Sequence, residues 1–488
     1  MDGPDSPRLG TEADTIAALA TARGEAALAI IRVSGPEAVQ IVASQFTCAA
    51  LKEAPSHTAH VGWITDADGE RLDQVVATLF RAPRSATGED VVEVSTHGGS
   101  AAPQLVLRAI LDAGARLAEP GEFTQRAFLN GKLDLAQAEA IADLIHARST
   151  AAARAAARGV EGRTSDALAE IKDRLLETAA LVELELDFSD EDVEFADRSQ
   201  LVSLLTEADQ QLGTLLSTAR LGALVRDGVR VVIGGRPNAG KSTLLNALVE
   251  HDRAIVSDIP GTTRDRVEAE REIDGLLFRF VDTAGLRETA DAVEAEGVRR
   301  SREAAETADV LLYVVDARTG PDAEERAFLS DLRARRPGLA ILRVANKADL
   351  VGALERRTPA DSIRLGVEAG PPADLEGDHA SWQPLSARAA LTDPARLSPL
   401  REALIEAVRR GDSEPESGVL VTNERHRQLL TTARGAVGRA RAHAEAGTSG
   451  DLLALDLRAA LDALGRITGA VTPDDVLGAI FGRFCIGK

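Results

Sequence analysis

A glycine-rich segment that ends in lysine and serine offers the clearest chemistry in this sequence. Residues 235–242 read Gly-Arg-Pro-Asn-Ala-Gly-Lys-Ser, which fits G-x-x-x-x-G-K-[ST], and they lie between an apolar run and a helical pattern. The glycines let backbone N–H groups face an anion, Lys241 reaches the β- and γ-phosphates, and Ser242 offers its hydroxyl to Mg²⁺. The segment predicts a nucleoside triphosphate site with phosphate contacts from Asn238, Ala239, Gly240, Lys241, Ser242 and Thr243.

Three shorter motifs further along the chain indicate that the base is guanine. A D-T-A-G motif can hold Mg²⁺ through water and sense the γ-phosphate with its glycine N–H. In the N-K-A-D motif, the final carboxylate can accept two N–H groups that guanine offers and adenine lacks. A Ser-Ala pair follows and would support the base with a main-chain N–H. The predicted contacts are Asp282, Gly285, Asn346, Lys347, Asp349, Ser386 and Ala387. In this order, the motifs predict a GTPase.

The group that orients the attacking water is not obvious from these motifs. Many small GTPases have a glutamine directly after D-x-x-G, but here that position is Leu286, which cannot hydrogen-bond to water. Another side chain must therefore do this work, or hydrolysis is slow. The acidic candidates in the following segment are Glu288, Asp291, Glu294 and Glu296.

Composition excludes several other classes of protein. The 488 residues carry a formal net charge of −21, which does not fit a polybasic nucleic-acid coat. Two Trp, one Tyr and eleven Phe leave little material for a base-stacking platform. The two cysteines, Cys48 and Cys485, are too few for a disulfide framework or a Cys-ligated zinc site. No apolar run reaches the roughly 18 residues of a membrane helix, so we expect a cytoplasmic protein without a membrane span.

The patterning predicts a multidomain fold of α/β and all-α parts. Residues 1–131 mix short apolar runs, turn signals and helical stretches, which predicts an α+β module. Residues 132–224 contain no proline and resemble residues 411–488 in helical character, so both are expected to form one helical domain. Residues 225–410 alternate apolar runs with helical patterns, which indicates a parallel α/β domain inserted into the helical one.

Nearly the whole chain resembles the tRNA modification GTPase family MnmE, also called TrmE. The resemblance lies in the GTPase motifs, in two specific segments, residues 120–145 and the terminal FCIGK (484–488), and in three shorter ones: IIRVSG (30–35), TGEDVVEV (87–94) and DIPGTTRD (258–265). The resemblance implies an N-terminal folate-binding and dimerisation domain, a helical domain and an inserted G domain. It also implies GTP hydrolysis with bound K⁺ and Mg²⁺.

The resemblance gives roles to further residues of the nucleotide site. It implies K⁺ ligands at Asn238, Ser257, Ile259 and Thr262. Thr263 would join Ser242 on Mg²⁺, and Glu294 would orient the water, which fills the vacancy at Leu286. A monovalent cation beside the phosphates would supply the positive charge that an arginine finger supplies elsewhere. The catalytic set is thus expected to be Glu294, Asn238 and Lys241.

The resemblance also implies a tetrahydrofolate carrying a formyl or methylene unit in the first module. The matching positions are Arg32, Glu93, Lys132 and Lys488. Basic groups can pair with the folate carboxylates, and a carboxylate can accept the N–H donors of a pterin. Without the resemblance, Arg32 and Glu93 read as an ion pair at strand ends. Cys485 matches a terminal cysteine of the family, which leaves its chemistry open.

The partners that the resemblance implies are a second copy of the chain, a flavoprotein (MnmG, or GidA) and tRNA. Together they would add a carboxymethylaminomethyl-type group to C5 of the wobble uridine. Two alternatives stay open: a ribosome-assembly GTPase and a purely dimerising regulatory GTPase. A ribosome-assembly GTPase should carry a basic RNA-binding domain, whereas this chain has an acidic helical one.

Overall fold

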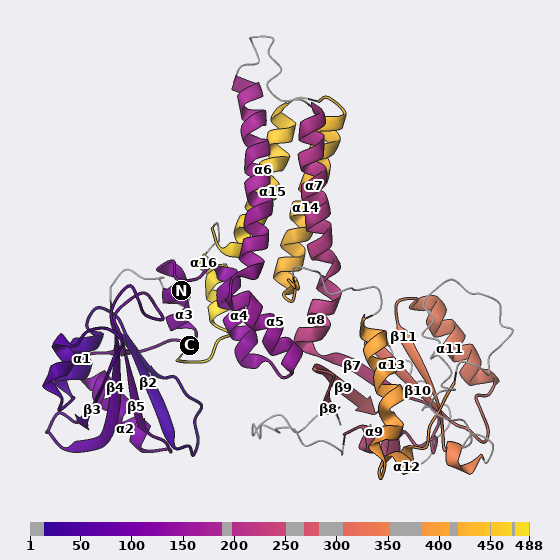
Figure 1. The fold of residues 1–488 in the computed structure, drawn as a ribbon, viewed down its shortest axis with the longest axis horizontal. Coiled ribbons are helices and arrows are strands. Elements are labelled where there is room, and N and C mark those ends of the chain that lie inside the picture. Colours follow the sequence, from indigo (N-terminus) through magenta and orange to yellow (C-terminus); the bar gives the residue numbers. More distant parts are fainter. Residues whose placement is uncertain are drawn as a thin grey trace, which may run out of the picture. The chain divides into compact units, whose positions relative to one another are not determined.

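The computed structural model describes residues 14–187, 198–249, 268–282, 306–351, 382–409, 418–448, 450–470 and 474–487. These residues form two compact units. One contains residues up to 145, 156–212 and 428 onward, and the other contains 146–155 and 213–427. Both units are discontinuous in sequence because the chain leaves the first unit for the second and returns to it (Figure 1).

The first unit begins with a mixed six-stranded sheet whose order is β3-β4-β5-β2-β1-β6. The strands are β1 (Ile16–Leu19), β2 (Leu28–Ser34), β3 (Thr58–Thr65), β4 (Arg71–Phe80), β5 (Val91–His97) and β6 (Arg116–Leu117). Alternate residues of β2, β4 and β5 pack on one face against α1 (Ala38–Ser44) and α2 (Ala102–Asp112). On the other face, Phe123 of α3 (Glu122–Leu129) packs against Ile16 and Ala18.

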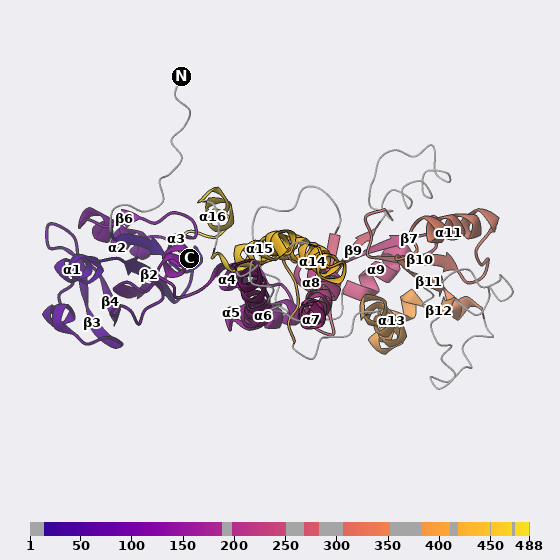
Figure 2. The same ribbon diagram turned by 90° about the horizontal axis from the view of Figure 1, so that it is seen from above.

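The same unit contains a bundle of four long helices (Figures 1 and 2). They are α6 (Arg163–Asp187), α7 (Arg198–Ser217), α14 (Glu424–Glu445) and α15 (Gly450–Thr468). Buried Leu and Val residues line the inside, and ion pairs join each helix to the next around the bundle. These pairs are Arg174–Glu207, Arg434–Asp209, Arg439–Asp456 and Arg458–Glu183. The shorter helices are α4 (Leu135–His146) and α16 (Asp474–Phe481), and α5 (Thr150–Val160) begins in the second unit and ends in the first.

The second unit is a doubly wound α/β domain with strand order β12-β11-β10-β7-β9-β8. The strands are β7 (Val229–Gly234), β8 (Glu268–Ile273), β9 (Leu276–Asp282), β10 (Val310–Asp316), β11 (Ala340–Asn346) and β12 (Gln383–Pro384). Helix α11 (Ala323–Arg335) covers one face. The opposite face packs against α8 (Ala219–Asp227), α9 (Lys241–Val249), α12 (Ala387–Ala390) and α13 (Ser398–Arg409).

This sheet differs from an all-parallel one at its β8 edge. Strand β8 pairs antiparallel with β9, whereas β7, β9, β10, β11 and β12 pair in parallel. The sequence of β8, Glu-Ala-Glu-Arg-Glu-Ile, has no apolar run, so it does not predict a strand. Charges suit an edge strand because they discourage further pairing. The glutamates Glu270 and Glu272 pair with Arg148 and Thr150 at the beginning of α5.

Within the described residues, no helix is both long enough and apolar enough to traverse a lipid bilayer.

Candidate functional site

The phosphate-binding loop runs from the carboxyl end of β7 to the beginning of α9. Its glycines are required by close backbone approaches. Gly240 has φ +93°, and a Cβ there would lie 2.2 Å from Nδ2 of Asn346. Gly235 has φ +134°, and a Cβ there would lie 2.1 Å from the carbonyl oxygen of Val314. A side chain at either position would force the loop away from the sheet.

Two side chains of the loop are placed for contact with ions. Lys241 is buried and its ammonium donates to the carbonyls of Gly235, at 2.9 Å, and Arg236, at 2.8 Å. Asn238 has φ +63° and an exposed side chain, whose amide makes no hydrogen bond within the described part of the chain. The loop therefore offers one cation and one free amide oxygen beside a helix beginning, an arrangement that suits a phosphate with counter-ions.

The N-K-A-D motif lies against this loop and fixes it. Asn346, the last residue of β11, donates to the carbonyl of Ala239 and accepts from the N–H of Ala387, both at 2.9 Å. Lys347 donates to the carbonyl of Asn238 at 2.6 Å and to Asp316 at 2.9 Å. Asn346 thus ties the predicted phosphate contacts to the predicted base contacts through one amide.

The residues expected to face the base lie at the same edge. The carboxylate of Asp349 is exposed and makes no hydrogen bond with any described residue, so it can accept two donors. Ser386 is buried and is the N-cap of α12, because its hydroxyl accepts from the N–H of Ala389. The predicted residues Asn346, Lys347, Asp349, Ser386 and Ala387 are therefore brought together.

Asp316 belongs to this edge although the sequence did not single it out. Hydrogen bonds from Arg318 and Lys347 outweigh the burial and hold the pKa of Asp316 well below its ordinary value. The carboxylate stays ionised and keeps Lys347 over the loop. A usable signal exists, because Asp316 ends a strand whose neighbour ends at Asn346, its register partner.

Several predicted residues lie outside the described part of the chain. They are Ser257, Ile259, Thr262, Thr263, Gly285, Glu294 and Lys488, together with the side chain of Asp282. Their roles therefore remain predictions, as do the choice among the acidic residues after Leu286 and the complete K⁺ and Mg²⁺ ligand sets.

Arg32 and Glu93 are register partners on β2 and β5 and form an ion pair through one carboxylate oxygen. Nε and Nη2 of Arg32 donate to Oε1 of Glu93 at 3.0 and 2.8 Å. The guanidinium lies 5.7 Å from the ring centroid of Phe123, a cation–π contact. About a fifth to a quarter of each side chain is exposed, and neither Nη1 of Arg32 nor Oε2 of Glu93 has a partner among the described residues. The pair is thus both an ion pair and an accessible donor and acceptor.

An ionic network holds α3, and with it Phe123, against the sheet. Arg126 donates to Asp14 at 2.5 Å and to Glu122 at 3.0 Å, and Arg116 donates to the same two carboxylates. Burial tends to raise the pKa of Asp14 and of Glu122, but the hydrogen bonds from Arg116 and Arg126 outweigh it and hold both below their ordinary values. Glu122 and Arg126, two residues of the 120–145 segment, thus have a structural role in holding α3.

The end of the chain returns to the first module. The carbonyl of Cys485 accepts from the N–H of Gly121 at 3.4 Å, and Ile486 pairs with Pro120. Gly487 has φ +95° and lies so close to β1 that a Cβ would be 2.3 Å from the carbonyl oxygen of Leu19. Lys132, by contrast, is tied to the carbonyl of Pro83 at 3.1 Å. Gly487, the residue before Lys488, thus lies against β1, and β1 pairs with β2, the strand of Arg32.

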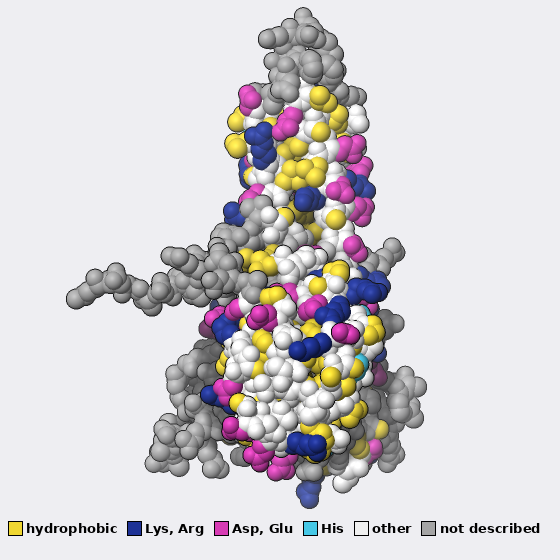
Figure 3. All heavy atoms as spheres, turned by 90° about the vertical axis from the view of Figure 1, so that its left-hand side faces the viewer, with side chains coloured by type: hydrophobic (Ala, Val, Ile, Leu, Met, Phe, Trp, Pro, Cys, Tyr) yellow, Lys and Arg dark blue, Asp and Glu magenta, His cyan; other side chains and the backbone are white. Residues whose placement is uncertain are grey.

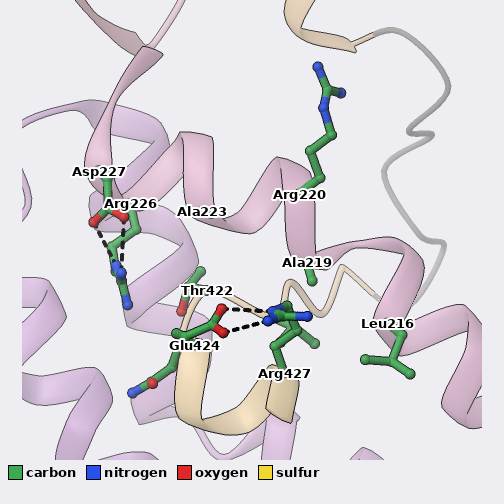
Figure 4. A pocket seen from close by; sticks show the side chains of 11 residues that line it. Leu216, Ala219, Arg220, Ala223, Arg226, Asp227, Thr422, Glu424 and Arg427 are labelled. Atoms are coloured by element: carbon green, nitrogen blue, oxygen red, sulfur yellow. Dashed lines mark hydrogen bonds and ion pairs between the residues drawn. The ribbon is translucent and has the colours of Figure 1, made fainter. Parts of the chain in front are cut away.

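A separate hollow of about 440 Å³ lies between α8 and residues 421–427 (Figure 4). It contains none of the predicted site residues. Arg226 pairs with Asp227 beside it, and Arg427 makes a bidentate pair with Glu424. Two of the three arginines that line the hollow are thus paired with carboxylates.

Comparison with known proteins matches nearly the whole chain. Residues 135–485 match the family described as the MnmE helical domain, and residues 15–132 match the GTP-binding protein TrmE N-terminus. The tRNA modification GTPase MnmE of Salinibacter ruber is 56% identical, over 98% of this chain and 100% of that protein. The protein of the same name from Cytophaga hutchinsonii is 42% identical, over 97% of this chain and 98% of that protein. Among solved structures, the FeoB G-domain of Methanococcus jannaschii is 28% identical over 37% of this chain and 98% of that chain, with a TM-score of 0.23.

Proposed function

The chain belongs to the MnmE family of tRNA modification GTPases, and we propose that it couples GTP hydrolysis to the addition of a carboxymethylaminomethyl-type group at C5 of wobble uridine. It is a GTP hydrolase involved in tRNA modification. The observation that carries the assignment of the nucleotide site is the bridge made by Asn346, which joins the phosphate-binding loop to the base-binding edge.

In the nucleotide site, each group of this chain has a distinct task. Lys241 exchanges its two loop carbonyls for phosphate oxygens when GTP binds, and Asp349 selects guanine. Asn238 holds K⁺ together with Ser257, Ile259 and Thr262, and its free amide supports this role. Ser242 and Thr263 hold Mg²⁺, Asp282 and Gly285 face the γ-phosphate, and Glu294 orients the water. The metal ions supply positive charge where the phosphate charge develops.

In the first module, Arg32 and Glu93 bind a tetrahydrofolate that carries a one-carbon unit. The fit rests on the unpaired Nη1 and Oε2 atoms, because an acceptor beside a donor matches the polar edge of a pterin. Lys132 and Lys488 pair with the folate carboxylates, and the placement of Gly487 on β1 supports the role of the chain end. The bound folate supplies the carbon that the modification adds.

The proposed assembly is a cytoplasmic homodimer that acts with the flavoprotein MnmG on tRNA. The first module leaves large apolar side chains of its sheet exposed, namely Leu28, Val61 and Val76, which supports a second copy as its partner. On the face shown in Figure 3, Lys and Arg side chains are scattered among Asp and Glu instead of forming one basic surface. This supports an arrangement in which the flavoprotein supplies most of the tRNA contacts.

Calorimetry with 5-formyltetrahydrofolate tests the folate part of the proposal. We expect binding to the wild-type chain and a loss of at least tenfold in affinity for Arg32→Met, since a charged hydrogen bond contributes about 1.5–3 kcal/mol. Arg108→Met is the matched control, because Arg108 is an exposed arginine of the same module that pairs with Asp112. No heat of binding to the wild-type chain would remove the folate assignment and favour a purely regulatory GTPase.

Steady-state hydrolysis in K⁺ and in Na⁺ tests the catalytic part. We expect much faster turnover in K⁺, and Glu294→Ala should lower kcat by about 10²-fold with little change in GTP affinity. Equal rates in the two salts would contradict the K⁺ ligand set. If Glu288→Ala has the larger effect instead, the water-orienting role belongs to Glu288.

A further inference from the structure

Arg236, the second residue of the phosphate-binding loop, has no role in the mechanism above. Its side chain turns to the beginning of α11 and forms an ion pair with Asp322. Nε of Arg236 also lies 3.8 Å from Oε2 of Glu325. The guanidinium therefore joins the loop to a helix on the α11 face of the sheet.

The backbone of Arg236 supports the two side chains that the site presents to ions. Its carbonyl accepts from the ammonium of Lys241 at 2.8 Å and from the N–H of Ala239 at 3.3 Å. The second bond closes a four-residue turn with Pro237 and Asn238 at its centre. Proline followed by a residue of positive φ is the signature of a type II turn, and Asn238 has φ +63°. A shift of Arg236 would therefore move both Lys241 and Asn238.

The far end of the ion pair is rigidly held. Asp322 and Glu325 form a capping box at the beginning of α11, with bonds of 2.8 and 3.1 Å. Glu325 is only 2% exposed, and its Oε1 accepts from the hydroxyl of buried Tyr313 at 3.2 Å. Tyr313 lies on β10 opposite Gly234, the residue just before the loop. Glu325 thus contacts β10, which pairs with β7, the strand that the loop follows.

Removal of Arg236 would leave Glu325 with the Tyr313 hydroxyl and the Asp322 N–H but without the cation beside its carboxylate. Burial raises the pKa of Glu325, and Arg236 is the cation that opposes the shift. A buried carboxylate that loses its counter-ion is strongly destabilised. The attraction between Arg236 and these carboxylates therefore favours the contact between the loop and α11.

We propose that Arg236 is a positioning residue for the nucleotide: anchored on Asp322 and Glu325, it holds the 236–239 turn in the conformation that binds phosphate. It does not touch the phosphate itself, because its guanidinium is directed to α11. The proposal rests on nucleotide binding and not on the K⁺ ligand set, so equal hydrolysis rates in K⁺ and Na⁺ would leave it intact.

Stopped-flow release of a fluorescent GDP from the full chain tests the proposal. We expect Arg236→Met to release GDP about tenfold faster than the wild type, equivalent to about 1.4 kcal/mol. Asp322→Asn should speed release in the same direction but less, since asparagine keeps the helix cap while the charge is lost. Arg236→Lys should release GDP more slowly than Arg236→Met, because lysine keeps a positive charge at this position. Arg335→Met is the control, because Arg335 is an exposed arginine of α11 that pairs with Asp331.

Thermal unfolding without nucleotide separates positioning from simple support of the fold. Under the proposal, Asp322→Asn changes GDP release while its Tm stays near that of the wild type. If Arg236→Met and Asp322→Asn both release GDP at the wild-type rate, whatever their Tm, the positioning role is wrong. An equal acceleration in Arg335→Met would overturn it as well, because the effect would then not be specific to the loop.

Discussion

The close approach of Gly240 to Asn346 predicts a large effect of one methyl group on nucleotide binding. In Gly240→Ala, the new Cβ would lie 2.2 Å from Nδ2 of Asn346 at a residue with φ +93°. A non-glycine residue in such a conformation costs about 1–3 kcal/mol. Displacing the Asn346 amide also weakens its bonds to Ala239 and Ala387, at about 0.5–1.5 kcal/mol each.

The lower ends of these ranges already sum to about 2 kcal/mol, or roughly 30-fold in affinity. We therefore expect Gly240→Ala to weaken GDP binding at least tenfold, a smaller loss than the full sum, since strain that also remains in the free protein does not change the affinity. Titration with fluorescent GDP measures the affinity, and circular dichroism confirms that the variant is folded. Gly338→Ala is the control, because a Cβ at this glycine of the same unit meets nothing within 4 Å. A folded Gly240→Ala that binds GDP within twofold of the wild type would refute the reasoning.

Three further outcomes follow from the described contacts. The pKa values of Asp14 and Glu122 are held below their ordinary values of 3.8 and 4.5, so their contribution to the free energy of unfolding is complete above about pH 5 and is lost as the pH falls through the folded-state values. Urea unfolding from pH 6 to 3 should show this loss, and Glu122→Gln should make the free energy of unfolding depend less steeply on pH. Asp349→Asn should weaken GDP binding by about 10²-fold or more, measured by calorimetry, because we propose that the exposed carboxylate accepts two guanine donors. Gly487→Ala should push the chain end off Leu19 and weaken folate binding with an unchanged Tm; unaltered affinity would mean that the chain end is not part of the site.

The positions of the phosphate-binding loop and the N-K-A-D motif at strand ends could be predicted from the sequence because each motif is local. The loop from Gly235 to Ser242 and the N-K-A-D motif are short runs whose backbone conformation depends on glycine and on strand ends. The ionic network around α3 could not be found in this way. Arg126 and Asp14 are 112 residues apart, and their charges read as ordinary surface charges until the fold brings them together.

The β8 strand shows a second reason for failure. Four of its six residues are charged, as suits a strand at a sheet edge, so the apolar signal that marks β7, β10 and β11 is absent. Arg271 of this strand is nevertheless buried, because it donates to the carbonyl of Leu248 near the end of α9. The sequence likewise does not predict the contacts of Arg236, since its partners Asp322 and Glu325 lie about 90 residues further along the chain, at the beginning of α11.

Nucleoside analysis of tRNA tests the proposed function most directly. A strain that lacks this chain should lose the C5 group on wobble uridine, and expression of the wild-type chain should restore it. Lys241→Ala should not restore it, because the proposal requires GTP hydrolysis. An unchanged set of modified uridines in the deletion strain, or full restoration by Lys241→Ala, would contradict the proposal that GTP hydrolysis by this chain supports the modification.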